Sequence, residues 1–316
     1  MRFKIFKFLF PVLLFTYSLA SAKNEADSVK VGAYIISIHD INFHSQEYTV
    51  RFWLWFVYDN PKFDFAKQID IINAKDLDIS SVSIDTVNGK YWARMRVKCT
   101  MKENWRVSDF PFDTQHLNII LEDEGIDIGD LVFVADTVSS RFDNVEILSG
   151  WKVYDFKVRT GIVKLNTSFG TPEIADDTQT FSKFTIEMNI EREAKGLFLK
   201  IFLGMYFAFM IALVSFLSDT NELEPRFGLP VGGLFAAVGN KYIIDSLLPE
   251  SSQFSLVDIL HSLTFFGIFS ILTISAIALK LHNAGNVSTA HRFRKVGAVI
   301  VILGYILANI YYVINS

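Results

Sequence analysis

The sequence predicts an all-β outer domain followed by an all-α bundle of four membrane-spanning helices. In a long N-terminal region apolar and polar residues alternate, as they do in strands with one buried face. The C-terminal region contains four apolar runs, each near the ~20 residues that a helix needs to cross a bilayer. The chain has 316 residues and is 51% hydrophobic, which is typical of a membrane protein that carries one folded domain outside the lipid.

Residues 1–22 are expected to be a secretory signal peptide. Three cations precede an apolar run over residues 8–19, and Ala20-Ser21-Ala22 offers small residues for cleavage. A retained anchor is the alternative, although the apolar run is short for a span. The formal net charge of -4 excludes the basic surface that nucleic-acid binding requires.

Residues 23–195 are expected to form the outer domain, a β-sandwich. The clearest strand pattern covers ten residues. One of its faces holds Tyr48, Val50, Phe52, Leu54 and Phe56, and the other holds Thr49, Arg51, Trp53, Trp55 and Val57. Several such runs separated by turn residues predict a sandwich. Because Cys99 is the one cysteine, no internal disulfide can form, and core packing must hold the domain together.

Residues 196–316 are expected to form the membrane domain. The four helices are predicted at about 197–217, 227–248, 256–279 and 296–314. The loop at 280–295 carries four Lys and Arg residues, and the loop at 249–255 carries none. By the positive-inside rule, this difference places the outer domain outside the cell membrane.

A stiff turn joins the two halves. It reads Phe110-Pro111-Phe112-Asp113 and is followed by Gln115, and Pro111 restricts the backbone of Phe110. This turn resembles the signature motif of the Cys-loop receptor superfamily, the pentameric ligand-gated ion channels. In that family two bridged cysteines flank the motif, whereas Glu103 and Leu117 stand at those positions here. Absence of the bridge resembles the bacterial branch of the family.

The resemblance implies a homopentamer of immunoglobulin-like sandwiches above four-helix bundles, in a bacterial inner membrane with the N-terminal domain in the periplasm. It implies a ligand-gated or proton-gated channel, selective for inorganic cations, surrounded by membrane lipid. The alternative is a non-conducting pentameric receptor or scaffold that signals to partner proteins, because Pro230 and four glycines are unusual in a pore helix. No nucleophile motif, phosphate loop or His/Cys metal cluster points to an enzyme.

The second helix is expected to line the pore. Steps of three and four residues place one stripe on a single helix face: Glu224, Gly228, Gly232, Phe235, Gly239 and Tyr242. A ring of Phe235 would form an apolar gate that closes by dewetting, unless this residue packs against a neighbour or lipid. A ring of Glu224 would attract cations, unless this carboxylate only stabilises the start of the helix.

The resemblance also implies a set of residues that couple the outer domain to the membrane. Asp113 and Arg192 are expected to pair, either to transmit movement or simply to anchor the turn. The remaining expected members of this contact are Pro111, Phe112, Pro249 and either Asp40 or Asn42.

A ligand site is expected in the outer domain. Trp151, after Ser149-Gly150, resembles an aromatic residue of the family's second ligand-binding loop. With Phe169 or Phe181, and with Phe52, Trp53 or Trp55 of a neighbouring subunit, it would form an aromatic box for an amine or another small organic molecule. For each of these aromatic residues, core packing is the alternative.

An acidic turn has oxygens enough for Ca²⁺. Its carboxylates belong to Glu122, Asp123 and Asp127, although solvated acidic turns are commoner than calcium sites. No other cofactor is expected. Protonation of these carboxylates, or of His116, offers a route to pH sensitivity.

Overall fold

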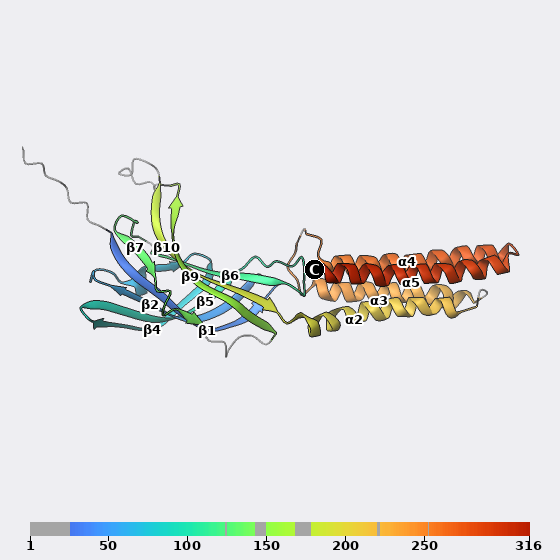
Figure 1. The fold of residues 1–316 in the computed structure, drawn as a ribbon, viewed down its shortest axis with the longest axis horizontal. Helices are drawn as coiled ribbons and strands as arrows, with labels where there is room; N and C mark the ends of the chain where they lie inside the picture. The colour runs from blue at the N-terminus through green and yellow to red at the C-terminus, as the bar shows by residue number, and fades with distance from the viewer. Residues whose placement is uncertain (1–25, 124, 143–149, 168–177, 220–221, 252) are drawn as a thin grey trace, which may run out of the picture.

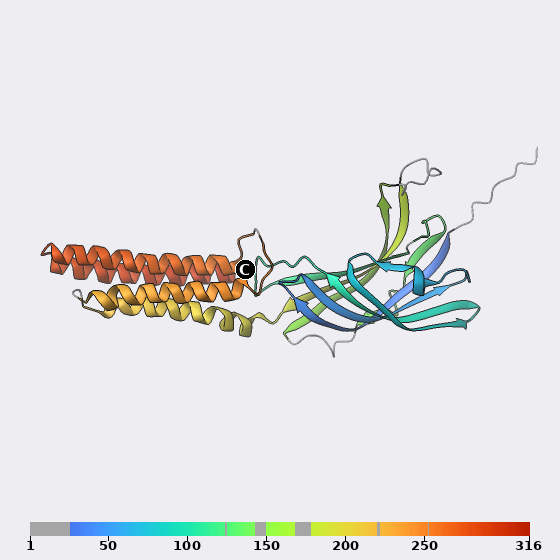
Figure 2. The ribbon, with the colours of Figure 1, turned by 180° about the vertical axis from the view of Figure 1, so that it is seen from behind.

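The computed structural model describes residues 26–123, 125–142, 150–167, 178–219, 222–251 and 253–316. The molecule is elongated, with a β-sandwich at one end and four helices lying side by side at the other (Figures 1 and 2). The C-terminus lies at the junction between the two parts (Figure 1). The expected signal peptide lies outside the described residues.

Two sheets form the sandwich. The first has the strand order β4 (Ala74–Val87), β5 (Lys90–Lys102), β2 (Glu47–Tyr58), β1 (Asp27–Asn42) and β7 (Leu131–Ala135), and β8 (Arg141–Phe142) also pairs with β1. The second has the order β3 (Ile69–Ile71), β6 (Thr114–Asp123), β10 (Gln179–Arg192) and β9 (Trp151–Leu165). A short helix, α1 (Phe65–Gln68), precedes β3. The predicted fold class is confirmed.

The sandwich core follows the alternation seen in the sequence. Tyr48, Val50, Phe52, Leu54 and Phe56 of β2 are all fully buried. Phe56 also stacks on Phe65 of α1, with ring centroids 4.3 Å apart. Burying an aromatic or aliphatic side chain of this size contributes roughly 1.5–3 kcal/mol, so these rows stabilise the domain without a disulfide.

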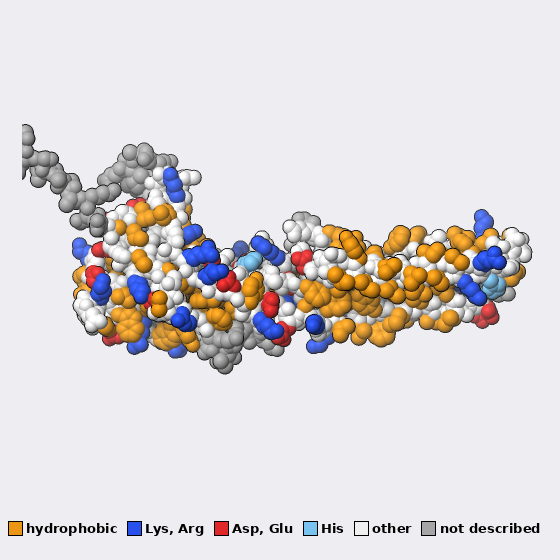
Figure 3. All heavy atoms as spheres, viewed as in Figure 1, with side chains coloured by type: hydrophobic (Ala, Val, Ile, Leu, Met, Phe, Trp, Pro, Cys, Tyr) orange, Lys and Arg blue, Asp and Glu red, His pale blue; other side chains and the backbone are white. Residues whose placement is uncertain are grey.

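The bundle contains α2 (Ala194–Val214), which continues into the 3-10 turn η1 (Ser215–Leu217), then α3 (Leu223–Asp245), α4 (Leu256–Asn283) and α5 (Val287–Ile314). Within the described part of the chain, these four helices are long and apolar enough to cross a membrane. Hydrophobic side chains cover the visible face of the bundle, and charged ones gather at its two ends (Figure 3). The protein is therefore a multi-pass membrane protein.

The helices differ from the predicted spans mainly at their ends. The last helix begins at Val287 rather than at 296, and the second begins at Leu223 rather than at 227. The predicted spans followed the apolar runs, but helical hydrogen bonding continues beyond them into the charged ends of the bundle. Glu224 therefore lies inside the first turn of α3.

One glycine of α3 is required for helix packing. A Cβ atom at Gly233 would lie 2.6 Å from the carbonyl oxygen of Ala208 in α2, closer than atoms can approach. Small residues permit such close approach between membrane helices. This contact explains Gly233, whereas Gly228, Gly232 and Gly239 have open space around them.

Candidate functional site

A buried ion pair lies where the sandwich meets the bundle. Arg192 Nε donates to Asp113 Oδ1 over 2.8 Å, and Nη2 donates to Oδ2 over 3.2 Å. The strands bring the two together, because Glu191 at the end of β10 faces Thr114 at the start of β6. Gln115 also donates to Asp113 Oδ2 over 2.7 Å, and Asp113 is only 3% exposed. The pair expected from the sequence is present, and its two-pronged geometry is the strong form of this interaction.

Three aromatic rings enclose the guanidinium of Arg192. Its Cζ atom lies 4.0 Å from the ring centroid of Trp151, 4.7 Å from that of Phe43 and 5.0 Å from that of Phe110. Trp105 stacks on Phe43 at 4.8 Å, which extends the aromatic cluster. Arg192 is thus fixed by a carboxylate and by the faces of three rings.

The expected ligand role of Trp151 is wrong for a site shared with Phe181. Trp151 is the first residue of β9 and lies opposite Arg192, whereas Phe181 lies opposite Val163. The eleven residue steps of β10 from Phe181 to Arg192 span about 36 Å, at about 3.3 Å per residue. The sequence indicated a strand that begins at Trp151, but it could not show which residues of β10 that strand pairs with.

The other residues of the expected aromatic box are also dispersed. Phe52 is fully buried in the sandwich core, because it belongs to the inward face of β2, so its ligand role is wrong. Trp53 and Trp55 are half-buried on the opposite face of that strand. Phe169 lies outside the described residues. No aromatic box forms within the part of one chain that the structure describes.

Phe181 instead lines an acidic pocket of about 450 Å³ at the edge of the second sheet. Asp70, Glu122 and Asp123 contribute carboxylates to it. Burial, followed by the nearby charge of Asp70, raises the pKa of Glu122, while Lys183 acts in the opposite direction. A positively charged group would bind favourably at this wall, because its charge would offset the cost of burying the ionised Glu122.

The acidic turn beside this pocket does not hold calcium ligands in position. Asp123 Oδ1 accepts backbone N–H groups of Gly125 and Ile126, each over 3.1 Å, and Asp127 Oδ1 accepts that of Gly129 over 2.9 Å. Within the described ranges no group of three His, Cys, Asp or Glu side chains could hold a metal ion. These carboxylates cap turns, and the calcium expectation is not supported.

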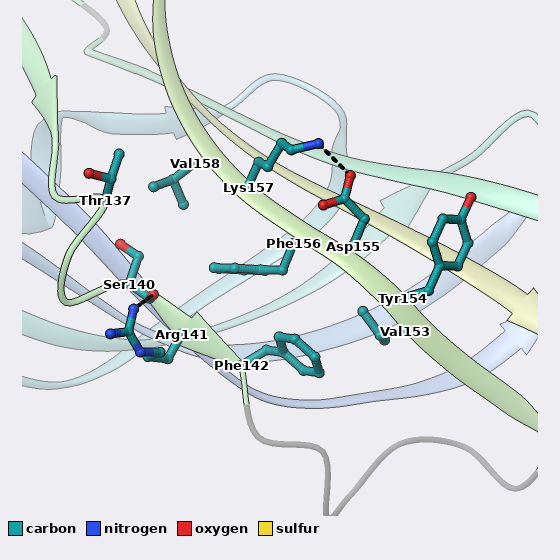
Figure 4. Close-up of a pocket in the computed structure, with 10 residues that line it drawn as sticks. All are labelled: Thr137, Ser140, Arg141, Phe142, Val153, Tyr154, Asp155, Phe156, Lys157 and Val158. Atoms are coloured by element: carbon teal, nitrogen blue, oxygen red, sulfur yellow. Dashed lines mark hydrogen bonds and ion pairs between the residues drawn. The ribbon is translucent and has the colours of Figure 1, made fainter.

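A second outer-domain pocket was missed by sequence reasoning. It has a volume of about 410 Å³ and lies between β8 and β9 (Figure 4). Phe142 and Phe156 pack on one another at 5.7 Å inside it, and Lys157 pairs with Asp155 at its rim over 2.6 Å (Figure 4). Because β8 has only two residues, no periodic pattern in the sequence could reveal it.

The turn at 110–113 contacts the bundle directly. Phe112 packs on Phe198 of α2 with centroids 5.5 Å apart, and the backbone N–H of Leu256 in α4 donates to the Ser108 carbonyl over 2.8 Å. Pro111 is buried beside them. The same loop therefore touches the first and third spans, while Asp113 ties it to β10.

The remaining residues expected in the coupling contact have different surroundings. Asp40 is exposed and pairs with His39 at 3.7 Å, so its place in the junction stays a prediction. Asn42, the alternative, accepts a bond from Trp105 Nε1 over 2.9 Å and thereby joins the aromatic cluster. Pro249 is buried and lines a cavity of about 500 Å³ between the sandwich and the loop after α3.

The stripe predicted on the second helix is exposed along its whole length. Glu224, Gly228, Gly232, Phe235, Gly239 and Tyr242 all face away from the rest of the chain. The exposed fractions are 72% for Phe235 and 76% for Tyr242. The opposite face of α3 is buried against the bundle, through Arg226, Pro230, Gly233, Ala237 and Ile244.

Arg226 is unrelated to the exposed stripe. Glu224 and Arg226 are two positions apart in the helix, which places their side chains about 200° apart around its axis. Arg226 therefore faces the bundle while Glu224 faces outward. Its side chain is fully buried and its Nη2 donates to the Ser218 carbonyl over 3.4 Å. Arg294 donates to the same oxygen over 2.8 Å. Arg226 therefore does not pair with Glu224.

A polar contact inside the bundle escaped sequence reasoning. His261 of α4 is fully buried, and its Nε2 lies 3.1 Å from Asn240 Oδ1 of α3. Asn240 Nδ2 donates in turn to the Ile201 carbonyl of α2 over 3.1 Å. Asn240 therefore joins three spans. Polar residues inside apolar runs were the available signal, because such residues usually mark contacts between helices.

Fold and site together define a membrane protein with an N-terminal β-sandwich, a tightly packed junction and four spans. No protein-family model matches the chain. A curated protein, the "Proton-gated ion channel" of Gloeobacter violaceus, is 25% identical over 186 residues, which is 58% of this chain. The match spans about half of that protein, 48% of its length. This distant likeness supports the resemblance to pentameric ligand-gated channels noted above.

Proposed function

We propose that the protein is a homopentameric, cation-selective ion channel of a bacterial inner membrane, opened by protons or by a small ligand at its periplasmic domain. The α3 helices of five subunits surround the pore. The outer sandwiches sense the stimulus and pass it to the bundle through the junction around Asp113 and Arg192.

The observation that supports this proposal most is the two-faced character of α3. Its buried face packs on α2 and α4. The opposite face presents Glu224, three glycines and two large aromatic residues, which no described part of the chain covers. A ring of five such faces would place Glu224 at the inner mouth, where carboxylates attract cations. Phe235 and Tyr242 would form apolar constrictions, and an apolar constriction closes by dewetting.

The junction supports the proposed coupling. Asp113 and Arg192 connect β6 with β10. The loop they anchor touches α2 through Phe112 on Phe198, and α4 through the hydrogen bond from Leu256 to Ser108. A tightly packed contact of this kind transmits displacement, because packed interfaces respond by discrete rearrangement rather than by gradual deformation.

A polar cavity beside this junction offers a place for protons to act. Its volume is about 540 Å³, and Glu103, Arg106, His116 and Glu250 are among the residues that line it. Burial raises the pKa of Glu103, while backbone hydrogen bonding to Asn104 and the charges of His116 and Arg106 oppose the shift. Protonation here would change the charge between the sandwich and the loop after α3.

Recording from purified protein in planar bilayers tests the function. We expect cation-selective currents that appear when the periplasmic side is acidified or when a ligand is added. In a salt gradient, Glu224→Gln should shift the reversal potential toward that of a less selective pore. A correctly assembled ring that passes no current under any of these conditions would favour the non-conducting receptor instead.

A further inference from the structure

The cavity of about 410 Å³ between β8 and β9 has the size and composition of a small-molecule site (Figure 4). Such sites are hollows of roughly 300–1,000 Å³, lined mainly by apolar and aromatic side chains with a few polar groups. Among the described residues, this cavity shares none of its lining with the acidic pocket or with the cavities at the junction. Its apolar lining consists of Phe142, Val153, Phe156 and Val158.

The β8 wall of the cavity is fixed to the first sheet. Ser140 is 3% exposed, its Oγ accepts the Ala33 N–H of β1 over 3.1 Å, and its own N–H donates to the Asp136 carbonyl over 3.1 Å. Arg141, the next residue, lies opposite Tyr34 of β1. A wall positioned in this way keeps its shape without a ligand, so less conformational entropy is lost on binding.

The β9 wall of the cavity contains a β-bulge. Two neighbouring residues of β10 lie opposite Asp155 and Val153, which are two positions apart in β9. Tyr154 is therefore an extra residue in this strand. An ordinary strand turns alternate residues to opposite faces, whereas every residue in the range 153–158 contributes to the lining of this cavity. Bulges re-aim side chains in this way, and they are over-represented next to functional sites.

The polar lining of the cavity favours an anion. Asp155 Oδ2 accepts hydrogen bonds from Lys157 Nζ over 2.6 Å and from Asn189 Nδ2 over 3.2 Å, so this carboxylate is already paired. Arg141 Nη1 donates to the adjacent Ser140 carbonyl over 2.9 Å, and no carboxylate of the described residues pairs with this guanidinium. A guanidinium has five N–H donors in a planar fork that fits a carboxylate, and most of those of Arg141 are open to a ligand.

We propose that the cavity between β8 and β9 binds a small organic acid. The aromatic or branched apolar part of the ligand packs on Phe142 and Phe156, and its carboxylate accepts hydrogen bonds from Arg141. The amine expected from the sequence does not fit here, because Arg141 and Lys157 outnumber Asp155 in the lining. All the residues of this site come from one chain, so binding does not depend on the proposed ring or on conduction.

Occupation of the site would be transmitted to the junction along β9. Val153 lines the cavity, and Trp151, two residues earlier in the same strand, lies over the guanidinium of Arg192. We therefore expect a bound acid to change the current that acidification evokes. This second step rests on the proposed channel function, whereas the binding step does not.

Calorimetric titration of the purified full-length protein with benzoate tests the site. Benzoate should bind more tightly than benzyl alcohol or benzylammonium, which share its ring and lack its carboxylate. Arg141→Gln should weaken benzoate binding about ten- to hundredfold, because charge-assisted hydrogen bonds are lost. The same variant should leave the binding of benzyl alcohol nearly unchanged.

A pair of neighbouring tryptophan substitutions gives a matched control. Thr137 and Val138 are both exposed, so neither substitution removes a buried core residue. Thr137 lines the cavity, whereas Val138 is 75% exposed and does not belong to the lining. Thr137→Trp should fill the cavity and abolish benzoate binding, and Val138→Trp should leave it intact.

The outcomes separate this inference from the channel proposal. Wild-type protein that does not bind benzoate, binding that is unchanged in Arg141→Gln and Thr137→Trp, or tighter binding of benzylammonium would overturn the site. In planar bilayers, benzoate should change the acid-evoked current of the wild type but not that of Thr137→Trp. Mutation-sensitive binding in a protein without current would keep the site and remove the channel, and acid-evoked current without benzoate binding would do the reverse.

Discussion

At the scale of single residues, the junction depends on Arg192. Its charge is neutralised by Asp113, its plane is held by Trp151, Phe43 and Phe110, and its side chain is only 12% exposed. A lysine could keep the charge but could neither donate two parallel bonds nor cover the rings in the same way. The family resemblance predicted the ion pair, but not its aromatic surroundings.

Asp113→Asn should destabilise the protein strongly, because it leaves the guanidinium of Arg192 buried without a counter-charge. The expected loss is of the order of 3–5 kcal/mol, read from unfolding in detergent. Glu187→Gln is the matched control: its partner Arg159 is 61% exposed, so we expect a loss below about 1 kcal/mol. Equal stability of the two variants would show that the Asp113 pair is not structural.

Glu103 should make stability depend on pH. Burial raises its pKa above the usual 4.5, so the folded protein binds this proton more tightly than the unfolded chain does. The contribution of Glu103 to stability should therefore fall as pH rises from 4.5 through the raised pKa. Glu103→Gln should abolish this part of the slope when melting temperatures are compared over a pH series. Parallel slopes for the two proteins would contradict the shift.

At the scale of elements, the period of each sequence pattern predicted which residues share a face, but it did not predict where the helices begin and end. Alternation in β2 correctly separated the buried row that contains Phe52 from the half-buried row that contains Trp53, and steps of three and four correctly grouped the exposed face of α3. Strand pairing could not be read from the sequence, because register is set by contacts between distant segments. This is why Trp151 and Phe181 were joined in one site although they lie far apart along β9 and β10.

Asn240 connects three helices of the bundle, and this role can be tested by mutation. Asn240→Ala removes its bonds to His261 in α4 and to Ile201 in α2. Hydrogen bonds between membrane helices average about 0.6 kcal/mol, so the combined loss is about 1 kcal/mol. We expect assembly to persist and the equilibrium between closed and open states to shift about fivefold, measured as the half-activating proton or ligand concentration.

The control for this variant is Asn315→Ala. Asn315 lies beyond α5 and is exposed, and its hydrogen bonds with described residues go to the Tyr311 carbonyl of its own helix end. It should leave the half-activating concentration unchanged. A matching shift in both variants would mean that Asn240 has no special role in holding α2, α3 and α4 together.

At the scale of the whole molecule, the sandwich and the bundle are stabilised by different contacts, and the two parts meet at a small junction. The sandwich is held by buried aromatic rows, and the bundle by close helix packing and a few polar contacts. The order of domains and the four spans could be predicted because they depend on composition and period. The acidic pocket could not, because it combines residues from separate strands.

The central claim is that the exposed stripe of α3 faces an aqueous pore in the assembled protein. Cysteines placed singly at Gly228, Gly232, Phe235 and Gly239 can be compared with cysteines at Ala237 and Ile244 on the buried face. The measurement is block of the bilayer current by a membrane-impermeant cationic thiol reagent. We predict rapid block at the four stripe positions and none at the two buried ones. Protection of the stripe, or equal reaction on both faces of α3, would contradict the account.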